Sequence, residues 1–258
     1  MNLFTCGQGG CVEAKKVEAS DIGGQTKYLG AIVRGDTTKK QIALVFTGDE
    51  FADGGTSIQK TLKDRGINAS FFLTGNFYRN KSFKSIIKKI KADGHYLGAH
   101  SNKHLLYCDW QKRDSLLVTQ SEFKDDLLAN YKEMERFGVY KQNALYFLPP
   151  YEWYNQSISN WTKAQELQLI NFSTGTRSNA DYTYPELGKA YRNSDEILKS
   201  IKTYNEVQSN GLNGFILLLH IGTDPRRTDK FYNHLDELIT YLQQNGYDLV
   251  RIDNLLNH

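Results

Sequence analysis

The sequence predicts an α/β fold in which a parallel sheet closes into a barrel with helices on its outside. Seven short apolar runs recur along the 258 residues and alternate with segments of helical periodicity. Such alternation is typical of repeated strand–helix units, and a barrel closes their parallel sheet without exposed edges. Glycines fall near the ends of the helical segments, where a residue in the left-handed conformation stops a helix before the next strand.

The expected elements follow in chain order. The apolar runs interpreted as strands span residues 42–47, 69–74, 96–99, 144–148, 169–173, 215–220 and 248–252. Apolar side chains at helical spacing lie between several of them, in the groups Ile58/Leu62, Phe83/Ile86/Ile87/Ile90, Phe123/Leu127/Tyr131/Met134 and Phe231/Leu235/Leu238/Ile239/Leu242. The expected helix-stopping glycines are Gly66, Gly94, Gly138, Gly211 and Gly246. No repeat, low-complexity tract or linker interrupts this order, so we expect a single domain.

The N-terminal residues differ from the rest of the chain. Residues 1–28 are rich in Gly, Lys and small polar residues without periodicity, so we expect a loosely ordered arm there and a barrel domain over residues 29–258. Residues 28–34 and 41–46 flank a polar stretch and suggest a hairpin leading into the domain. Of the three cysteines, Cys6 and Cys11 could pair, which would leave Cys108 free.

Composition narrows the class of protein. Hydrophobic residues make up 40% and charged residues 24% of the chain, which is ordinary for a globular protein. A net charge of +3 is small for this length and gives no case for nucleic-acid binding. No apolar run approaches the ~20 residues that a membrane-spanning helix needs. Nothing in the sequence indicates an oligomeric state.

Reactive side chains collect after the expected strands, at the end where parallel α/β barrels carry their active sites. The residues that follow or end the first, third and sixth strands are Asp49, Glu50, His100, His104 and His220. The segments after the fourth and fifth strands add Tyr151, Trp153, Arg177, Asp181 and Tyr182. This convergence on one face predicts an active site there.

His100 and His104 are four residues apart, so on a helical turn both imidazoles would point the same way and could share one cation. An acid from another strand would leave open positions for water and substrate, as catalytic zinc sites require. Zinc suits this nitrogen-rich ligand set, and cobalt or nickel could substitute. Two unrelated surface or capping histidines remain the alternative.

The acids and the last histidine also have two interpretations. Asp49 and Glu50 could cap the following helix, but Asp53 lies closer to its start and is the better capping or loop candidate. His220 ends a fully apolar strand and is either a proton-transfer group or a buried histidine satisfied by backbone.

In this order the segments resemble those of the polysaccharide deacetylases of the NodB-homology group (carbohydrate esterase family 4), from about Tyr28 to the C-terminus. Residues 45–50, Val-Phe-Thr-Gly-Asp-Glu, stand where the family has Thr-Phe-Asp-Asp-Gly, and residues 69–75 look like its Ala-Thr-Phe-Phe-Val-x-Gly strand. His100-Ser-Asn-Lys-His104 matches its metal-binding His-Ser/Thr-x-x-His. Residues 148–151 resemble its Arg-x-Pro-Tyr and residues 217–220 its Leu-x-x-His.

The resemblance implies a distorted (β/α)7 barrel, a divalent metal, and hydrolytic removal of acetyl groups from a sugar polymer. Carried over in order, Asp49 becomes the general base and Glu50 the metal ligand beside the two histidines. Asp49 as ligand, with Glu50 or a bound water completing the site, stays open. Asp181 corresponds to the carboxylate that pairs with the catalytic His220 and raises its pKa, so that it acts as an acid.

Two departures from the family pattern stand out. The acids are displaced by about two residues after Phe46, and Leu148 replaces the arginine that orients the base. We expect Arg177 to supply that charge from the neighbouring strand. The family pattern also suggests that Tyr182, Trp110 and Trp153 line the acyl or sugar pocket and that the backbone N–H of Tyr151 holds the oxyanion.

The expected substrate is therefore an acetylated carbohydrate, with an N-acetylhexosamine polymer favoured. An acetylxylan-type ester, a small amide, or a catalytically weak carbohydrate-binding role stays open, the last because of the altered first motif and the missing arginine. No basic region or full apolar stretch precedes Cys6. We expect export to the periplasm or cell surface by a signal outside this chain, and a cytoplasmic location stays open.

Overall fold

The computed structural model describes residues 20–22 and 24–256. The helices are α1 (Gly55–Asp64), α2 (Gly75–Arg79), α3 (Lys84–Ala92), α4 (Gln120–Glu135), α5 (Gln156–Ala164), α6 (Ser194–Val207), α7 (Leu235–Gln244) and α8 (Ile252–Leu256). The strands are β1 (Ser20–Ile22), β2 (Gln25–Tyr28), β3 (Ala31–Arg34), β4 (Gln41–Gly48), β5 (Ser70–Leu73), β6 (Tyr96–Ala99), β7 (Tyr146–Phe147), β8 (Gln168–Leu169), β9 (Phe215–His220) and β10 (Asp248–Leu249).

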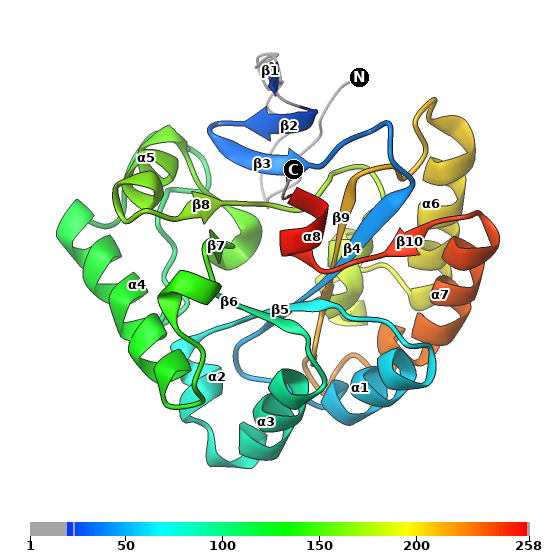
Figure 1. Ribbon diagram of the computed structural model, residues 1–258, viewed down its shortest axis with the longest axis horizontal. Helices are drawn as coiled ribbons and strands as arrows, with labels where there is room; N and C mark the ends of the chain where they lie inside the picture. Colours follow the sequence, from blue (N-terminus) through cyan, green and yellow to red (C-terminus); the bar gives the residue numbers. More distant parts are fainter. Residues whose placement is uncertain (1–19, 23, 257–258) are drawn as a thin grey trace.

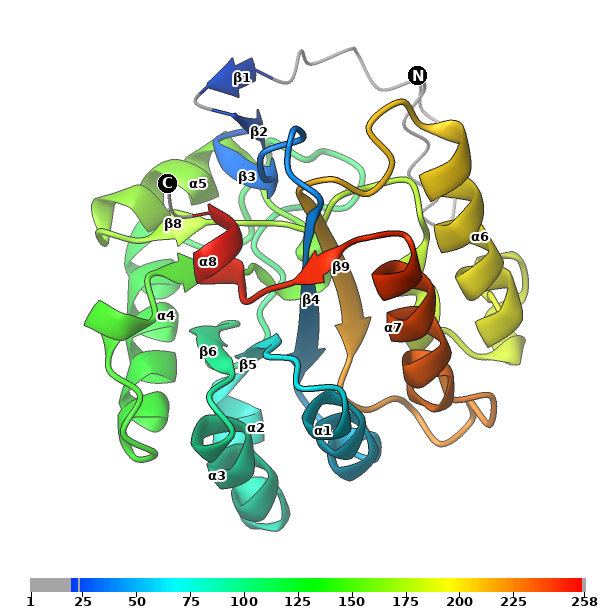
Figure 2. The same cartoon turned by 45° about the vertical axis from the view of Figure 1, so that its right-hand side comes forward.

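Seven strands form one parallel sheet that curls into an incomplete barrel, as the sequence predicts. The sheet runs β10-β4-β5-β6-β7-β8, and β9 pairs with the other side of β4. Helices α1, α3, α4, α6 and α7 stand around its outside (Figure 1). The long strands β4 and β9 lie side by side and point toward the same end of the molecule (Figure 2). That end is where the reactive side chains collect.

Irregular backbone spans the gap that the sheet leaves between β8 and β9. After β8 the chain changes partners: the Asn171 N–H donates to Ile32 O of β3 at 2.9 Å, and the Ser173 N–H donates to Ile216 O of β9 at 3.0 Å. The expected strand over 169–173 is therefore ordered but mostly outside regular pairing. This change of partner carries the chain from one sheet edge to the other.

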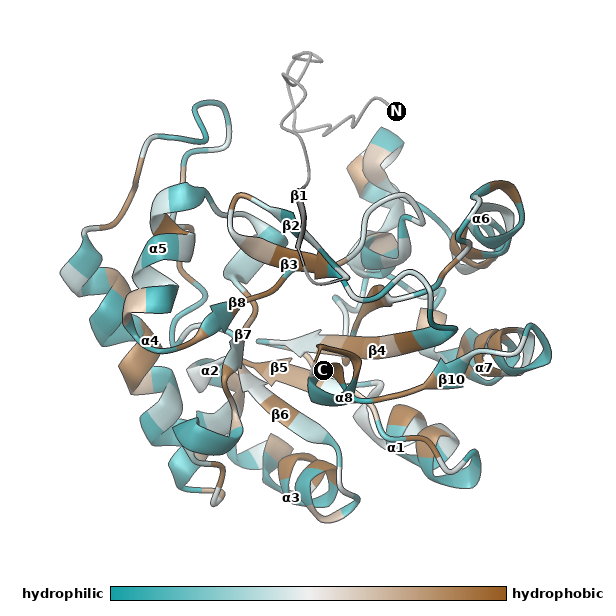
Figure 3. Cartoon of the chain, turned by 45° about the horizontal axis from the view of Figure 1, so that its top comes forward, coloured by the Kyte–Doolittle hydropathy of each residue, from teal (hydrophilic) through white to brown (hydrophobic). Residues whose placement is uncertain are grey.

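Strand alternation divides the core into two layers. Leu44 and Phe46 of β4 pack outward beneath the helices, whereas Ala43 and Val45 face the barrel interior. All of β4 after Gln41 is buried, which is typical of a strand covered on both faces. Figure 3 shows the apolar colouring along β4, β5 and β6 and the mixed colouring of the outer helices.

Most expected elements are confirmed, and the differences are local. The five helix-stopping glycines all have positive φ. The predicted hairpin between residues 28–34 and 41–46 is wrong: β3 pairs antiparallel with β2, and β4 belongs to the barrel. Residues 20–22 and 25–28 of the expected arm thus form strands, while its remainder, with Cys6 and Cys11, lies outside the described residues. Cys108 is a free, buried cysteine.

Candidate active site

Strand register brings one row of interior side chains to the C-terminal end of the barrel. Thr47 pairs in register with His220 of β9 and with Phe72 of β5. Because partners in register point to the same face of a sheet, Thr47 and His220 face the interior with Phe72. Continuing the β5–β6 register beyond the strand ends adds Thr74 and His100 to this row. The site is therefore built mainly from residues that end or follow strands.

The segment from His100 to His104 is an irregular loop, so the predicted helical turn is wrong. Ser101 and His104 have positive φ, at 73° and 54°. The loop wraps around the buried carboxylate of Asp126 in α4, which accepts hydrogen bonds from Ser101 Oγ at 2.6 Å and from the backbone N–H groups of Asn102 and Lys103 at 3.0 Å each. The two imidazoles nevertheless lie side by side, with ring centroids 5.2 Å apart.

A second residue of α4 fixes the start of this loop. Asn130 accepts the His100 N–H at 2.8 Å and donates to Leu73 O at 3.2 Å. Asp126 and Asn130 lie one turn apart on the buried face of α4, among Phe123 and Leu127. The sequence carried a signal for them, because polar residues on the apolar face of a helix need buried partners. Our sequence interpretation did not use that signal.

A backbone carbonyl fixes the tautomer of His100, as is typical of an imidazole that binds a metal. Its Nδ1 lies 2.8 Å from Leu148 O, which directs the other ring nitrogen, Nε2, to serve as the ligand. Burial, reinforced by neighbouring His104, holds the pKa of His100 well below its ordinary value. The ring is therefore neutral at physiological pH, which is the form that binds a cation.

His104 completes the imidazole pair from a more open position. Burial lowers the pKa of His104, and the charge of Asp49 opposes this shift. Its ring packs on that of Tyr151 at a centroid distance of 4.4 Å. His104 is thus held between an aromatic side chain and the carboxylate that follows β4.

Asp49 is held by residues that follow β5. Its Oδ1 accepts hydrogen bonds from Thr74 Oγ1 at 2.6 Å and from Asn76 Nδ2 at 3.1 Å. Arg79 in turn donates to Asn76 Oδ1 at 2.6 Å. The Arg79 guanidinium, in helix α2, is therefore linked to the Asp49 carboxylate through the side-chain amide of Asn76. The sequence interpretation did not assign this role to Arg79.

The packed core leaves no room for an acid directly after Thr47. A Cβ on Gly48 would lie 2.6 Å from Ile221 Cγ2 and 2.9 Å from Leu73 Cδ2, so any side chain at that position would collide with the packed core. The interior position before it holds Thr47, whose buried Oγ1 has no hydrogen-bond partner among the described residues. The first acid after β4 is therefore Asp49, directly after Gly48. Glu50 is exposed.

The imidazole pair fits a divalent cation in donor type and protonation state. His100 Nε2 is directed by the bond at Nδ1, and the pKa values of both histidines are lowered. The carboxylate is the part that does not join them: no group of three or more His, Cys, Asp or Glu side chains in the described part of the chain could hold a metal ion. In this structure Asp49 instead turns to Thr74 and Asn76.

His220 lies at the same C-terminal end of the barrel, here called the barrel mouth, and is paired with the Asp181 carboxylate. Its Nδ1 is 2.6 Å from Asp181 Oδ1, and its backbone N–H donates to Asp181 Oδ2 at 2.8 Å. Burial acts to lower the pKa of His220, but the charge and hydrogen bond of Asp181 outweigh it, and the pKa is raised. Tyr182 packs its ring 5.1 Å from the imidazole. The sequence-predicted partners His220 and Asp181 are therefore in direct contact.

Glu152 is an acidic group that the sequence interpretation passed over. It belongs to the turn Pro150–Glu152 after β7 and interacts electrostatically with His220 and Asp181. Burial raises the pKa of the Glu152 carboxyl to about 7. Its position after a barrel strand was the available signal, since every strand end of the sheet contributes to the same mouth.

Leu148 stands where the family has an arginine, and Arg177 was predicted to supply the missing charge. Leu148 is fully buried in the interior core. Arg177 is exposed, adopts the left-handed conformation with φ 57°, and acts electrostatically on Tyr182. Hydrogen bonds to Asp49 come from Thr74 and Asn76, so the role of Arg177 at the base stays a prediction.

Exposed aromatic side chains flank both His104 and His220. Trp110, Tyr151 and Tyr182 have 54%, 44% and 47% of their surface exposed. The Trp110 ring lies 5.6 Å from that of Tyr151 and 5.5 Å from that of Trp153. Trp153 is anchored below by Asp109 O at 3.1 Å and by the Arg113 guanidinium over its ring at 3.9 Å. Exposed aromatic faces on a rigid base suit the apolar faces of sugar rings.

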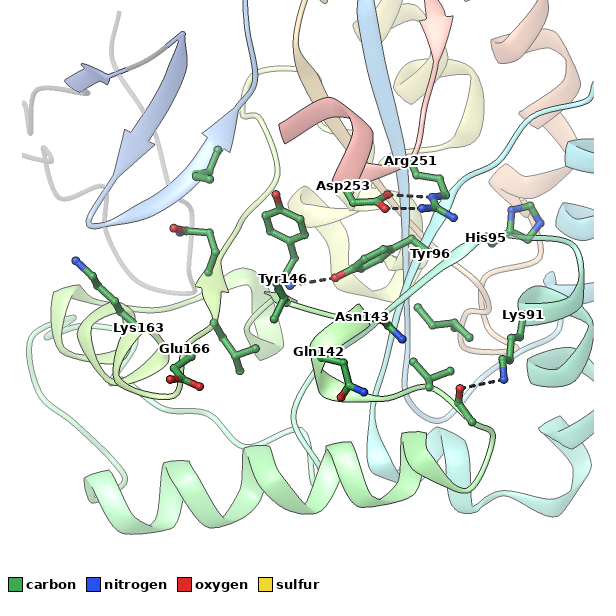
Figure 4. A pocket seen from close by; sticks show the side chains of 17 residues that line it. Lys91, His95, Tyr96, Gln142, Asn143, Tyr146, Lys163, Glu166, Arg251 and Asp253 are labelled. Carbon is green, nitrogen blue, oxygen red and sulfur yellow. Dashed lines mark hydrogen bonds and ion pairs between the residues drawn. The ribbon is translucent and has the colours of Figure 1, made fainter. Parts of the chain in front are cut away.

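Two other features belong to the scaffold. Asp53 does not cap α1 but accepts the Thr223 N–H at 2.8 Å and pairs with Lys230 at 2.9 Å, tying together the loops after β4 and β9. A cavity of about 850 Å³ lies at the opposite end of the strands, against Tyr96, Tyr146 and Gln168 (Figure 4). None of the predicted site residues lines it.

No helix among residues 20–22 and 24–256 is long and apolar enough to cross a membrane.

Comparison with known proteins identifies the family to which the fold and the motifs belong. The sequence profile of the polysaccharide deacetylase family matches residues 34–170, more than half of the chain.

Individual relatives agree with that match. The peptidoglycan-N-acetylmuramic acid deacetylase PdaA of Bacillus subtilis is 26% identical over 88% of this chain and 75% of its own length. A peptidoglycan-N-acetylglucosamine deacetylase of Bacillus cereus is 23% identical over 93% and 78%. A CE4 family pseudoenzyme from Bacillus anthracis superimposes with a TM-score of 0.68 at 20% identity, covering 90% of this chain and 70% of that one. The chain belongs to the polysaccharide deacetylase family, whose deacetylases are metalloenzymes that hydrolyse acetyl groups from carbohydrates.

Proposed function

We propose that this chain removes acetyl groups from an N-acetylhexosamine polymer at a single zinc-dependent site. The observation that supports the proposal is that histidines with opposite pKa shifts lie at the same barrel mouth. His100 and His104 have lowered pKa values, whereas His220 has a raised pKa beside Asp181. Neutral imidazoles suit cation binding and a protonated one suits acid catalysis.

The proposed ligands are His100, His104 and one carboxylate, with Asp49 or Glu50 as the candidates. Zinc suits two imidazole nitrogens, and cobalt or nickel would occupy the same ligands. When bound, a divalent cation supplies Lewis acidity, which polarises the acetyl carbonyl and lowers the pKa of water.

The remaining chemistry falls to the chain itself. In the proposed reaction, Asp49 takes a proton from the attacking water, whose oxygen bonds to the acetyl carbon. The backbone N–H of Tyr151 donates to the oxyanion, a contact worth about 3–4 kcal/mol when well aligned. His220 gives its proton to the leaving nitrogen as the C–N bond breaks. Acetate and a free amine are the products.

The substrate class draws on the printed activities of the relatives. Both named relatives act on N-acetylated sugars of peptidoglycan, and the exposed aromatic side chains suit a chain of sugar rings. Tyr151, Trp153, Tyr182 and Trp110 are the proposed contacts. Since peptidoglycan lies outside the cytoplasm, export of this protein to the periplasm or cell surface is part of the same proposal.

A weaker, binding-only role is the second candidate, and one observation favours it. Thr47 occupies the interior position at the end of β4 and Leu148 is buried after β7, so two positions where the resemblance implies charged groups are uncharged. In that case the site would hold the sugar without turnover.

Acetate release separates the candidates. Protein stripped by a chelator and reloaded with zinc is offered N-acetylated chitooligosaccharides, peptidoglycan fragments and acetylxylan. The proposal expects zinc-dependent acetate from the N-acetylated substrates. Acetate from acetylxylan alone would make the enzyme an esterase. Saturable binding of oligosaccharide without acetate from any substrate would establish the binding-only role.

A further inference from the structure

The start of α2 packs on the irregular loop from His100 to His104, here called the histidine loop. The Gly75 N–H, at the first position of the helix, donates to Ser101 O at 3.0 Å. The next N–H, that of Asn76, donates to Asn102 O at 3.1 Å. The first N–H groups of a helix lack acceptors within the helix, and here the histidine loop provides them. The segment after β5 and this loop are therefore joined through their backbones.

Arg79, also in α2, bonds both segments with its side chain. Its Nη1 donates to Asn102 Oδ1 at 2.5 Å, and its Nη2 donates to Asn76 Oδ1 at 2.6 Å and to Asn102 O at 3.2 Å. The carboxylate of Glu133 in α4 lies 3.8 Å from Nη1 and balances the charge. Because the donors of a guanidinium form a rigid planar fork, Arg79 fixes the two amides relative to each other.

Gly75 leaves the space in which these groups meet. A Cβ on Gly75 would lie 2.0 Å from Asn102 Oδ1 and 2.8 Å from Arg79 Nη1. Any side chain at this position would therefore push the amide and the guanidinium apart. Glycine is a poor helix former, so its place at the start of α2 is explained by this close approach.

Each amide leads to a different part of the proposed site. Asn76 Nδ2 donates to Asp49 Oδ1 at 3.1 Å. Asn102 belongs to the histidine loop, is 8% exposed, and donates its backbone N–H to Asp126 Oδ2 at 3.0 Å. Arg79 is therefore two hydrogen bonds away from the Asp49 carboxylate and is directly bonded to the histidine loop.

The order of the strands explains why a residue of α2 connects these parts. Asp49 follows β4 and the histidine loop follows β6, whereas α2 follows β5, which lies between those two strands in the sheet. Contacts from α2 are thus placed to set the distance between the acid and the two imidazoles. A misplacement of reacting groups by about 1 Å can cost about a hundredfold in rate.

We propose that Arg79 is a positioning residue for deacetylation. Through the amides of Asn76 and Asn102, its guanidinium holds the acid after β4 and the histidine loop in one fixed arrangement. The part of the proposal that concerns deacetylation rests on the proposed function. The joining of the two segments does not, and it is measured without metal or substrate.

The test is Arg79→Met, which keeps an unbranched side chain and removes the fork. The Arg79 side chain is 37% exposed, so we expect this variant to fold. The matched control is Arg136→Met, because Arg136 follows α4, is more exposed, and pairs with the same Glu133 at 2.6 Å. In metal-free protein, the NMR signals of the Asn76 side-chain amide and of the His104 ring should both shift in Arg79→Met and in neither case in Arg136→Met.

Activity gives the second readout. In zinc-loaded protein, kcat of Arg79→Met should fall about tenfold, as for the loss of a hydrogen bond to a charged group, while KM changes less than about twofold. Arg79→Lys should lose as much, because one ammonium does not reproduce the planar fork. The double variant with Asn76→Ala should also lose only about tenfold, since residues that act through one another are not additive. Arg136→Met should keep the wild-type kcat.

A shift of only one of the two NMR signals in Arg79→Met would overturn the proposal. So would a wild-type kcat in Arg79→Lys, or a loss of about a hundredfold in the double variant, which would mean that Arg79 and Asn76 act independently. If the wild type releases no acetate from any substrate, the proposed function fails instead. The NMR comparison alone then decides whether Arg79 joins the acid to the histidine loop.

Discussion

The two halves of the barrel mouth use histidine side chains in opposite protonation states. On one side, His100 and His104 lie in a loop wrapped around Asp126, and burial lowers their pKa values. On the other side, His220 ends β9, and Asp181 raises its pKa although burial acts to lower it. Burial alone drives an imidazole toward its neutral form. A bonded carboxylate is what separates the acid from the ligands.

The supporting carboxylates differ in the same way. Asp126 accepts hydrogen bonds from two backbone N–H groups and from the hydroxyls of Ser101 and Tyr107, so it shapes a loop, and it bonds no imidazole among the described residues. Asp181 bonds the imidazole itself. Asp126 therefore acts on loop geometry, with a lesser electrostatic effect on the pKa of His104, whereas Asp181 acts on the protonation of the imidazole that it bonds. Variants that remove each in turn should have different signatures.

Removing an imidazole of the ligand pair should have the largest effect. In His104→Ala we expect loss of bound metal and a fall in kcat/KM of about 10³-fold or more, because several kcal/mol of transition-state stabilisation depend on the cation. Metal analysis and acetate release check this. His234→Ala, at the residue directly before α7 and near Glu237, is the control, because no predicted site residue contacts His234 in the described part of the chain. Full metal content in His104→Ala would contradict the ligand assignment.

Removing the carboxylate of the acid half should spare the metal. In Asp181→Asn we expect kcat to fall at least about 10²-fold, the lower end for general acid catalysis, with metal content unchanged. Wild-type activity should be supported below the raised pKa of His220 and fall as the pH rises through it, because the acid loses its proton there. In Asp181→Asn that fall should begin at lower pH. A pH–rate profile identical to wild type would exclude this role.

Removing the carboxylate of the ligand half should act through metal affinity. Asp126→Asn weakens the acceptor that shapes the His100–His104 loop, and we expect a tenfold to hundredfold loss of affinity, roughly as for other residues that orient metal ligands. Metal competition titration checks it. Asp125→Asn is the matched control, since Asp125 is the exposed neighbour on the same helix. Equal affinities in the two variants would show that the loop keeps its shape without Asp126.

The support of Asp49 should give the smallest change. Asn76→Ala removes one hydrogen bond to a charged group, worth about 1.5–3 kcal/mol, so we expect roughly a tenfold fall in kcat/KM. Arg177→Ala tests the prediction made from sequence. If it leaves activity and metal affinity unchanged, Arg177 does not orient the base. If it costs more than Asn76→Ala, the relay through Asn76 and Arg79 is secondary.

Local patterns were enough for most of the fold. The span of β9 follows from a continuous apolar run, and the ends of α1 and α3 follow from glycines at positive φ. The segment over 169–173 was harder, because its backbone pairs with β3 and then β9. Helical spacing of His100 and His104 suggested a helical turn, but a distant carboxylate in α4 imposes another backbone. Long-range hydrogen bonds are invisible to a periodicity argument.

The sequence by itself determined the barrel, the end of the barrel that carries the chemistry, and the residues His100, His104, Asp181 and His220 that meet there. These follow from strand order and from residue type, which are local properties. The pairing of Asp181 with His220 followed from the family resemblance, but only the tertiary structure decided the partners of the other acids. Asp49 turns to Thr74 and Asn76, and Asp126 shapes the loop from His100 to His104. Such partnerships depend on burial and on distances between chain segments far apart in sequence, so they arise only when the barrel closes.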